Sequence, residues 1–207
     1  INTSATAIGA YTATVTLNNY AAASISSTTS GSGGAIAVYG KTDVTVNSNA
    51  GTISTTSGTT GYAYTIRSSG TANISNSGNI TATANGSNYA EAIYANTDVQ
   101  LTNNASGVVS AVTASNGSYA IEADRNATIS NAGSITAQTS GGSGSSQGVY
   151  AVGTTNVTNV GSSSVISGTT LGSGGATGIN NVGAVTISNE GSIFGSATGT
   201  GGANGVY

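Results

Sequence analysis

The sequence predicts an all-β fold: a parallel β-solenoid of about seven coils that spans residues 1–207 as one domain, with about 28 residues and three short strands per coil. Three observations lead to this prediction. One sequence fragment recurs at a nearly constant spacing, three apolar positions recur with it, and proline is absent. Repeats of about 20–50 residues are typical of solenoids, whose repeats bury their apolar faces only by stacking. Proline is disfavoured in a central strand because it cannot donate to the ladder.

The first strand of each coil is expected where the repeat is plainest. ISNSGNI at 74–80 returns as ISNAGSI at 129–135 and as ISNEGSI at 187–193. A flexible Ser/Gly linker, the alternative for this composition, would not keep apolar residues in phase. The opening apolar residue occurs seven times, at Leu17, Val46, Ile74, Leu101, Ile129, Val157 and Ile187.

The second and third strands follow from two further apolar columns. Local alternation such as I-T-A-T at 80–83 and A-I-Y at 92–94 is a strand signal. Gly/Ser/Asn stretches such as 31–34, 85–88, 140–148 and 199–202 separate the second strand from the third and are expected to be loops. The second column is Ile25, Ile53, Ile80, Val109, Ile135, Ile166 and Ile193; the third is Ile8, Val38, Ile66, Ile93, Ile121, Val149, Ile179 and Val206.

A polar column lies two residues after the first apolar one. Asparagine tolerates turn conformations, and stacked asparagines can hydrogen-bond to one another between strands. We therefore expect a structural ladder at a corner of the coil. It comprises Asn19, Asn76, Asn103, Asn131, Asn159 and Asn189, with Ser48 in the second coil.

Tyrosines gather around the third column, where Tyr62, Tyr64, Tyr89 and Tyr119 accompany a variable outward position. Tyrosine offers a large contact area at low entropic cost, which suits recognition. Aromatic residues also pack laterally on a sheet without any ligand, and this alternative stays open. The candidate interaction face comprises Tyr39, Arg67, Tyr94, Glu122, Tyr150 and Tyr207.

Hydroxyl pairs follow the second column, as in Ser54-x-Thr56 and Thr81-x-Thr83. A flat Thr-x-Thr array resembles the surface of solenoidal ice-binding proteins. Because Val112, Gln138 and Phe194 interrupt the array, a solvated strand surface is the preferred interpretation.

Composition excludes several functions. Only 4% of residues are charged, with three basic and six acidic side chains, and histidine and cysteine are absent. Common zinc sites and His- or Cys-based triads are therefore excluded, and we expect no cofactor. Three basic residues cannot follow a phosphate backbone, so no nucleic-acid partner is expected. No apolar run approaches the ~20 residues of a transmembrane helix.

Catalysis also finds little support, because the carboxylates are scattered. Glu91, Asp98, Glu122 and Glu190 fall in different columns. Asp43 shares a column with Asp98, but two coils apart and without a basic partner in register. The neighbouring Asp124 and Arg125 are expected to form a solvated loop pair. We therefore expect a protein that is not an enzyme.

The ISNxGxI and A-I-Y-A elements, with Asn-Gly corners and Gly/Ser loops, resemble the passenger repeats of bacterial autotransporters and related surface adhesins over essentially the whole chain. The resemblance implies a right-handed parallel β-helix on or outside the bacterial outer membrane, acting as a stalk, an adhesin or a matrix component. It implies nothing about the ligand.

These observations favour an extracellular structural β-solenoid of a bacterial surface or matrix fibre. The chain starts and ends in the same phase of the repeat and carries no obvious cap, so we expect end-to-end stacking of copies. The alternative is an adhesin segment that binds glycans or a host surface through the tyrosine-rich face. An ice-binding solenoid is the third hypothesis.

Overall fold

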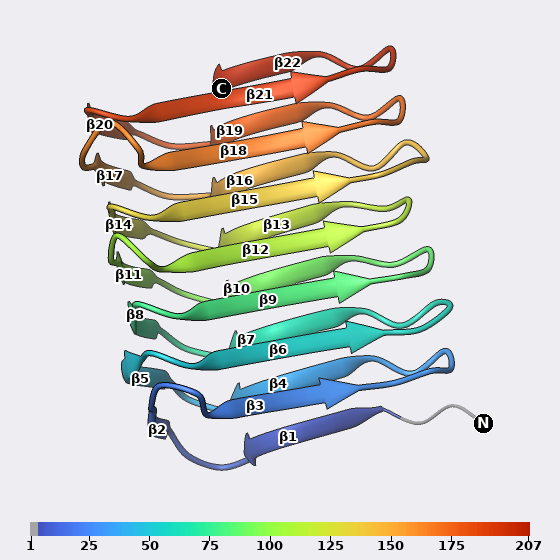
Figure 1. The fold of residues 1–207 in the computed structure, drawn as a ribbon, viewed down its shortest axis with the longest axis vertical. Helices are drawn as coiled ribbons and strands as arrows, with labels where there is room; N and C mark the ends of the chain where they lie inside the picture. The colour runs from blue at the N-terminus through green and yellow to red at the C-terminus, as the bar shows by residue number, and fades with distance from the viewer. Residues whose placement is uncertain (1–3) are drawn as a thin grey trace.

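The computed structural model describes residues 4–207 and confirms the predicted fold class. Within this range, strands and turns make up the chain and no helix occurs. Twenty-two strands stack as successive coils, three to a coil, and form three parallel sheets that run along the rod (Figure 1). The colours of the ribbon pass from blue to red along this axis, because each coil lies on the one before it.

Each sheet takes one strand from every coil. Sheet A has eight strands: β1 (Ala5–Ala10), β4 (Ala35–Gly40), β7 (Ala63–Ser68), β10 (Ala90–Ala95), β13 (Ser118–Ala123), β16 (Ser146–Ala151), β19 (Ala176–Asn181) and β22 (Ala203–Val206). Sheet B has seven: β2 (Val15–Asn19), β5 (Val44–Asn49), β8 (Ala72–Asn76), β11 (Val99–Asn103), β14 (Ala127–Asn131), β17 (Thr155–Asn159) and β20 (Val185–Asn189). Sheet C has seven: β3 (Ser24–Thr28), β6 (Thr52–Ser57), β9 (Asn79–Ala84), β12 (Val108–Thr113), β15 (Ser134–Thr139), β18 (Val165–Thr170) and β21 (Ser192–Ala197).

The three apolar columns of the sequence form the core. Ile93 pairs in register with Ile66 and Ile121, and the same alignment links Ile129 to Leu101 and Val157. These side chains are buried in the interior coils, so each coil completes the core of its neighbours.

Strands of sheet A bend in the middle, which breaks the alternation expected for the third segment. In β7, Thr65 and Ile66 are consecutive and both buried, whereas Tyr64 and Arg67 on either side are half-buried. The bend therefore gives sheet A two outward columns, three residues apart. Only the second of these was expected from the sequence. The first contains Thr6, Ile36, Tyr64, Glu91, Tyr119, Gln147 and Thr177.

Small residues at this bend let sheets A and C approach each other. In an early coil, Thr65 and Thr55 fill the space and their hydroxyls lie 2.8 Å apart. In a later coil the position opposite the bend is Gly168, where any side chain would collide with the carbonyl oxygens of Ser146 and Thr177. At this position the later coil therefore has no room for a side chain.

Candidate binding surfaces

The asparagine column forms a continuous buried ladder at the corner that follows sheet B. Each side-chain amide donates to the side-chain oxygen of the next coil, at 2.7–2.8 Å, from Asn19 through Asn189. The same amides also donate to backbone carbonyls at the corner, as Asn103 does to Gly107 at 3.1 Å. This arrangement satisfies buried polar groups and supports a structural role.

The second coil differs from the sequence expectation. Asn49, and not Ser48, occupies the ladder position. A register shift in β5 adds one residue and pairs Ser48 with Asn18, so that Asn49 aligns with Asn19. The ladder therefore contains Asn19, Asn49, Asn76, Asn103, Asn131, Asn159 and Asn189.

The outward side of sheet A carries most tyrosines, and we call it the tyrosine face. Its two columns hold Tyr39, Arg67, Tyr94, Glu122 and Tyr150 in one, and Tyr64, Glu91 and Tyr119 in the other. Rings from neighbouring coils pack at an angle, with centroids 5.7 Å apart for Tyr64 and Tyr94 and 6.1 Å apart for Tyr119 and Tyr150.

The predicted face residues fall into three groups. Arg67, Tyr94 and Glu122 lie together in the middle of the face, with Tyr150 beside them. Tyr39 packs against Tyr11 in an earlier coil, at a centroid distance of 5.3 Å. Tyr207 lies apart: it is 75% exposed and its backbone amide donates to Ile179.

Arg67 is held between two rings. Its guanidinium carbon lies 4.9 Å from the Tyr64 centroid and 5.8 Å from the Tyr94 centroid, which is cation–π geometry. Its Nε is buried and has no hydrogen-bond partner. Tyr94 in turn donates its hydroxyl to Asp124 at 2.9 Å.

A hollow of about 280 Å³ opens in the middle of the tyrosine face, lined by Tyr64, Tyr89, Glu91, Tyr119 and Glu122. We call it the acid–tyrosine hollow. Glu91 and Glu122 come from β10 and β13, which are adjacent strands. Glu91 is only 5% exposed, and its Oε2 is buried without a hydrogen-bond partner. An unpartnered buried carboxylate oxygen is unusual and costly.

Burial also shifts the ionisation of these groups. Desolvation, followed by the nearby Glu122 carboxylate, raises the pKa of Glu91 well above its ordinary value. Desolvation and the negative charge of Asp124 raise the pKa of Glu122 to about 7. The pKa values of the Tyr64 and Tyr119 phenols are raised too, chiefly by burial, so both rings stay protonated at neutral pH.

Sequence reasoning placed Glu91 and Glu122 in different columns and did not bring them together. The structure puts both columns on one face, because the bend in sheet A turns both outward. The signal in the sequence was the spacing of Tyr64, Glu91 and Tyr119, which matches the repeat.

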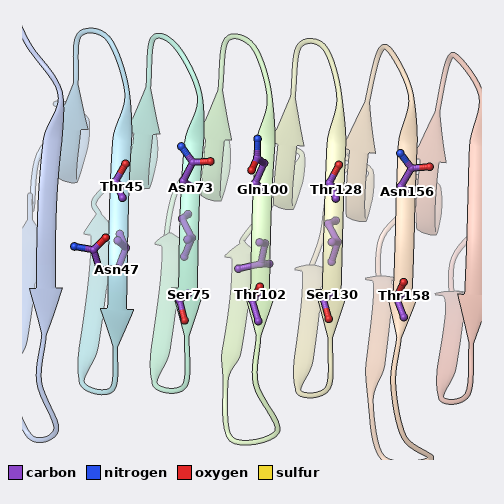
Figure 2. Close-up of a pocket in the computed structure, with 14 residues that line it drawn as sticks. Thr45, Asn47, Asn73, Ser75, Gln100, Thr102, Thr128, Ser130, Asn156 and Thr158 are labelled. Carbon is purple, nitrogen blue, oxygen red and sulfur yellow. The ribbon is translucent and has the colours of Figure 1, made fainter.

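Sheet B presents a second surface, a trough of about 470 Å³ that crosses several coils (Figure 2). The strands of sheet B form its floor, and two rows of outward polar side chains flank it, while the apolar residues between the rows are buried in the core. None of the polar side chains makes a hydrogen bond within residues 4–207, so all are free to bond water or an uncharged ligand. The rows are Thr45, Asn73, Gln100, Thr128 and Asn156 on one side, and Asn47, Ser75, Thr102, Ser130 and Thr158 on the other.

The hydroxyl pairs lie on sheet C, where the register places Val112 beside Thr83 and Phe194 beside Ser167. Gln138 follows Val112 in the same column. Val112 and Gln138 therefore fall inside the array and divide it, whereas Phe194 lies on β21, the end strand of the sheet.

The charged residues of the turns pair across coils. Arg125 forms a salt bridge with Asp98 of the preceding coil, and its Nε donates to Asp98 at 2.8 Å. The expected pair of Arg125 with Asp124 is therefore wrong, as is the expectation that Asp98 has no basic partner. Hydrogen bonds from Arg125 and Asn126 lower the pKa of Asp98.

Residues 4–207 show neither a metal-binding cluster nor a membrane-spanning helix. No cluster of three or more acidic, histidine or cysteine side chains that could hold a metal ion is found there. Nor does this part of the chain contain a helix of the length and apolarity needed to cross a membrane.

Comparisons with protein-family models, with curated proteins and with solved structures find no match to this chain.

Proposed function

We propose that the chain is a non-enzymatic, extracellular structural β-solenoid of a bacterial surface or matrix, and that its tyrosine face binds glycans. The observation that carries the proposal is the row of half-buried rings on sheet A, spaced by the strands. Adjacent parallel strands lie about 4.8 Å apart, so the rings form a regular platform along the rod.

Ring packing fixes this platform before any ligand arrives. Tyr64 contacts both Tyr62 and Tyr94, with centroids 5.0 and 5.7 Å apart, and Tyr119 contacts both Tyr89 and Tyr150. Rings that are already ordered lose little rotamer entropy on binding, which favours affinity. Their apolar faces can stack on sugar rings while their hydroxyls hydrogen-bond to sugar hydroxyls.

A glycan array followed by titration calorimetry tests the proposal. Tyr94→Ala and Tyr150→Ala should each weaken binding by about tenfold or more, because each removes a packed ring from the platform. Tyr20→Ala is the matched control, since Tyr20 is 74% exposed and lies outside sheet A. Glycan binding that survives both face substitutions would refute the tyrosine face as the site.

Self-association is a second candidate function, suggested by the coil that contains β20, β21 and β22. Val206 is 47% exposed there, whereas Ile179, its partner in the preceding strand, is fully buried. Phe194 in β21 is 42% exposed. A coil from a second copy has the same cross-section and would cover these side chains and the open strand edges.

Negative-stain electron microscopy over a concentration series tests this second function. End-to-end stacking should give fibres of uniform width whose length grows with concentration. Val206→Asp should shorten the fibres, because it places a charge against the stacked coil. Short rods at every concentration would contradict stacking.

A further inference from the structure

We propose that the acid–tyrosine hollow binds an ammonium group, so that the ligand of the tyrosine face is a glycan with free amino groups. This inference rests on the proposed glycan binding and names the class of glycan. It also assigns different roles to the residues: the half-buried rings of the tyrosine face bind the sugar, and the hollow binds its amino group.

The charge around the hollow favours a cation. Three carboxylates, those of Glu91, Glu122 and Asp124, face one guanidinium, that of Arg67. Arg125 does not add positive charge here, because it is paired with Asp98. The hollow is therefore negatively charged once its two glutamates ionise. An anionic or neutral ligand would leave this negative charge uncompensated.

The unpartnered oxygen of Glu91 points to the same ligand. Glu91 lines the hollow and its buried Oε2 has no hydrogen-bond partner, while the Arg67 guanidinium is stacked between Tyr64 and Tyr94. A ligand ammonium supplies both the missing donor and the missing charge, and hydrogen bonds between ionised partners are stronger than neutral ones.

The aromatic walls suit an organic cation better than a metal ion. Tyr64, Tyr89 and Tyr119 surround the two carboxylates, and an ammonium over a ring face gains cation–π attraction. Calcium prefers six to eight oxygen ligands, and two carboxylates in a tyrosine-lined hollow fall short of that number. The volume of about 280 Å³ lies near the lower limit for small-molecule pockets, which suits a single amino group with its sugar ring.

The pH dependence of binding follows from the groups that face the hollow. Glu122, with a pKa of about 7, becomes charged as the pH rises from 5 to 8, while burial and the Glu122 carboxylate raise the pKa of Glu91 well above its ordinary value. Asp124 accepts a hydrogen bond from Tyr94, and the Arg67 guanidinium lies over the Tyr94 ring. Affinity for an amino sugar should therefore rise from pH 5 toward neutral pH as Glu122 ionises, and fall again at higher pH, because the ammonium of the sugar loses its proton there.

Isothermal titration calorimetry with two hexasaccharides tests the inference. One is β-1,4-linked glucosamine with six free amines, and the other is its fully N-acetylated counterpart. The wild-type protein should bind the free-amine hexamer about tenfold more tightly near pH 6.5, where protonated amines and ionised Glu122 coexist, as expected for one additional charged contact. The preference should shrink at pH 5, where Glu122 is protonated.

Glu122→Gln should abolish the preference for the free-amine hexamer over its N-acetylated counterpart. Glu190→Gln is the control: Glu190 lies outside the hollow, and its side chain accepts a hydrogen bond from Gly161 that an amide oxygen can also accept. Glu91→Gln should act as Glu122→Gln does. Circular dichroism shows whether each variant is folded. If Glu91→Gln does not fold, Glu122→Gln alone tests the ammonium site.

The outcomes separate the two proposals. Equal binding of both hexamers would overturn the ammonium site and leave glycan binding by the tyrosine face intact. Binding of neither hexamer, with no hit on the array, would overturn both. Calcium chloride that binds the wild type but not Glu122→Gln would assign the hollow to a metal ion instead.

Discussion

Asn103→Ala should destabilise the rod far more than an asparagine change one column away. Asn103 is 1% exposed, receives a hydrogen bond from Asn76 at 2.8 Å and donates to Asn131 at 2.8 Å. It also donates to the backbone oxygen of Gly107 at 3.1 Å. The substitution cuts the ladder in its middle and leaves the Asn131 side-chain oxygen without this donor.

The magnitude follows from these contacts. Two lost ladder bonds contribute about 1 kcal/mol each, and a buried acceptor left unsatisfied costs about 1–3 kcal/mol. The free energy of unfolding should therefore fall by about 3–5 kcal/mol, measured by urea denaturation followed by circular dichroism. Asn73→Ala is the matched control, because Asn73 lies on β8, the neighbouring strand of the same sheet, but lines the trough and makes no side-chain hydrogen bond. It should change stability by less than about 0.5 kcal/mol. Equal losses in the two variants would refute the structural role of the ladder.

Three more predictions concern the core, the buried acid and the turns. Ile129→Asn should lower the free energy of unfolding by roughly 3–5 kcal/mol, because Ile129 is 1% exposed and has a coil on each side. Ile8→Asn should lower it by clearly less. Equal losses in the two variants would contradict stabilisation by stacking between coils. The melting temperature should be highest near pH 5 and fall toward pH 8, because the raised pKa of Glu122 favours the folded state only while the group is protonated. Glu122→Gln should make the melting temperature less dependent on pH. A wild-type melting temperature that rises with pH over this range would contradict the reasoning. Arg125→Gln should leave the melting temperature nearly unchanged, because the salt bridge of Arg125 is exposed. Asp98→Ala should lower the melting temperature more, because Asp98 also accepts a hydrogen bond from the backbone amide of Asn126. A larger loss in Arg125→Gln than in Asp98→Ala would contradict this prediction.

The fold was predictable from the sequence because a strand's burial pattern repeats whenever coils stack. The three apolar columns, anchored by residues such as Ile74, Ile80 and Ile93, are the same columns that the register pairs. The regular spacing of the apolar residues was enough to predict which strands pair, because each coil contacts only the coils next to it.

Local irregularities were not predictable in the same way. The bulge that brings Asn49 into the ladder adds one residue to β5, and a fixed offset from Val46 pointed to Ser48 instead. The bend in sheet A depends on packing against sheet C, as in the contact of Thr65 with Thr55. Simple alternation could not reveal it.

The candidate sites were predictable only in part. Repetition identified Tyr94 and Glu122 as neighbours on an outward column. The hollow required Glu91 as well, which comes from the other column and becomes its neighbour only through the bend. The trough of sheet B depends on the shape of a surface whose residues, such as Asn73 and Ser75, look like ordinary solvated strand positions.

A crystal structure of the protein with the glucosamine hexamer would test the central claim most directly. The account predicts sugar rings stacked along the tyrosine face, with one amino nitrogen within hydrogen-bonding distance of the Glu91 Oε2. A hexamer bound in the trough of sheet B, with the acid–tyrosine hollow empty, would contradict it.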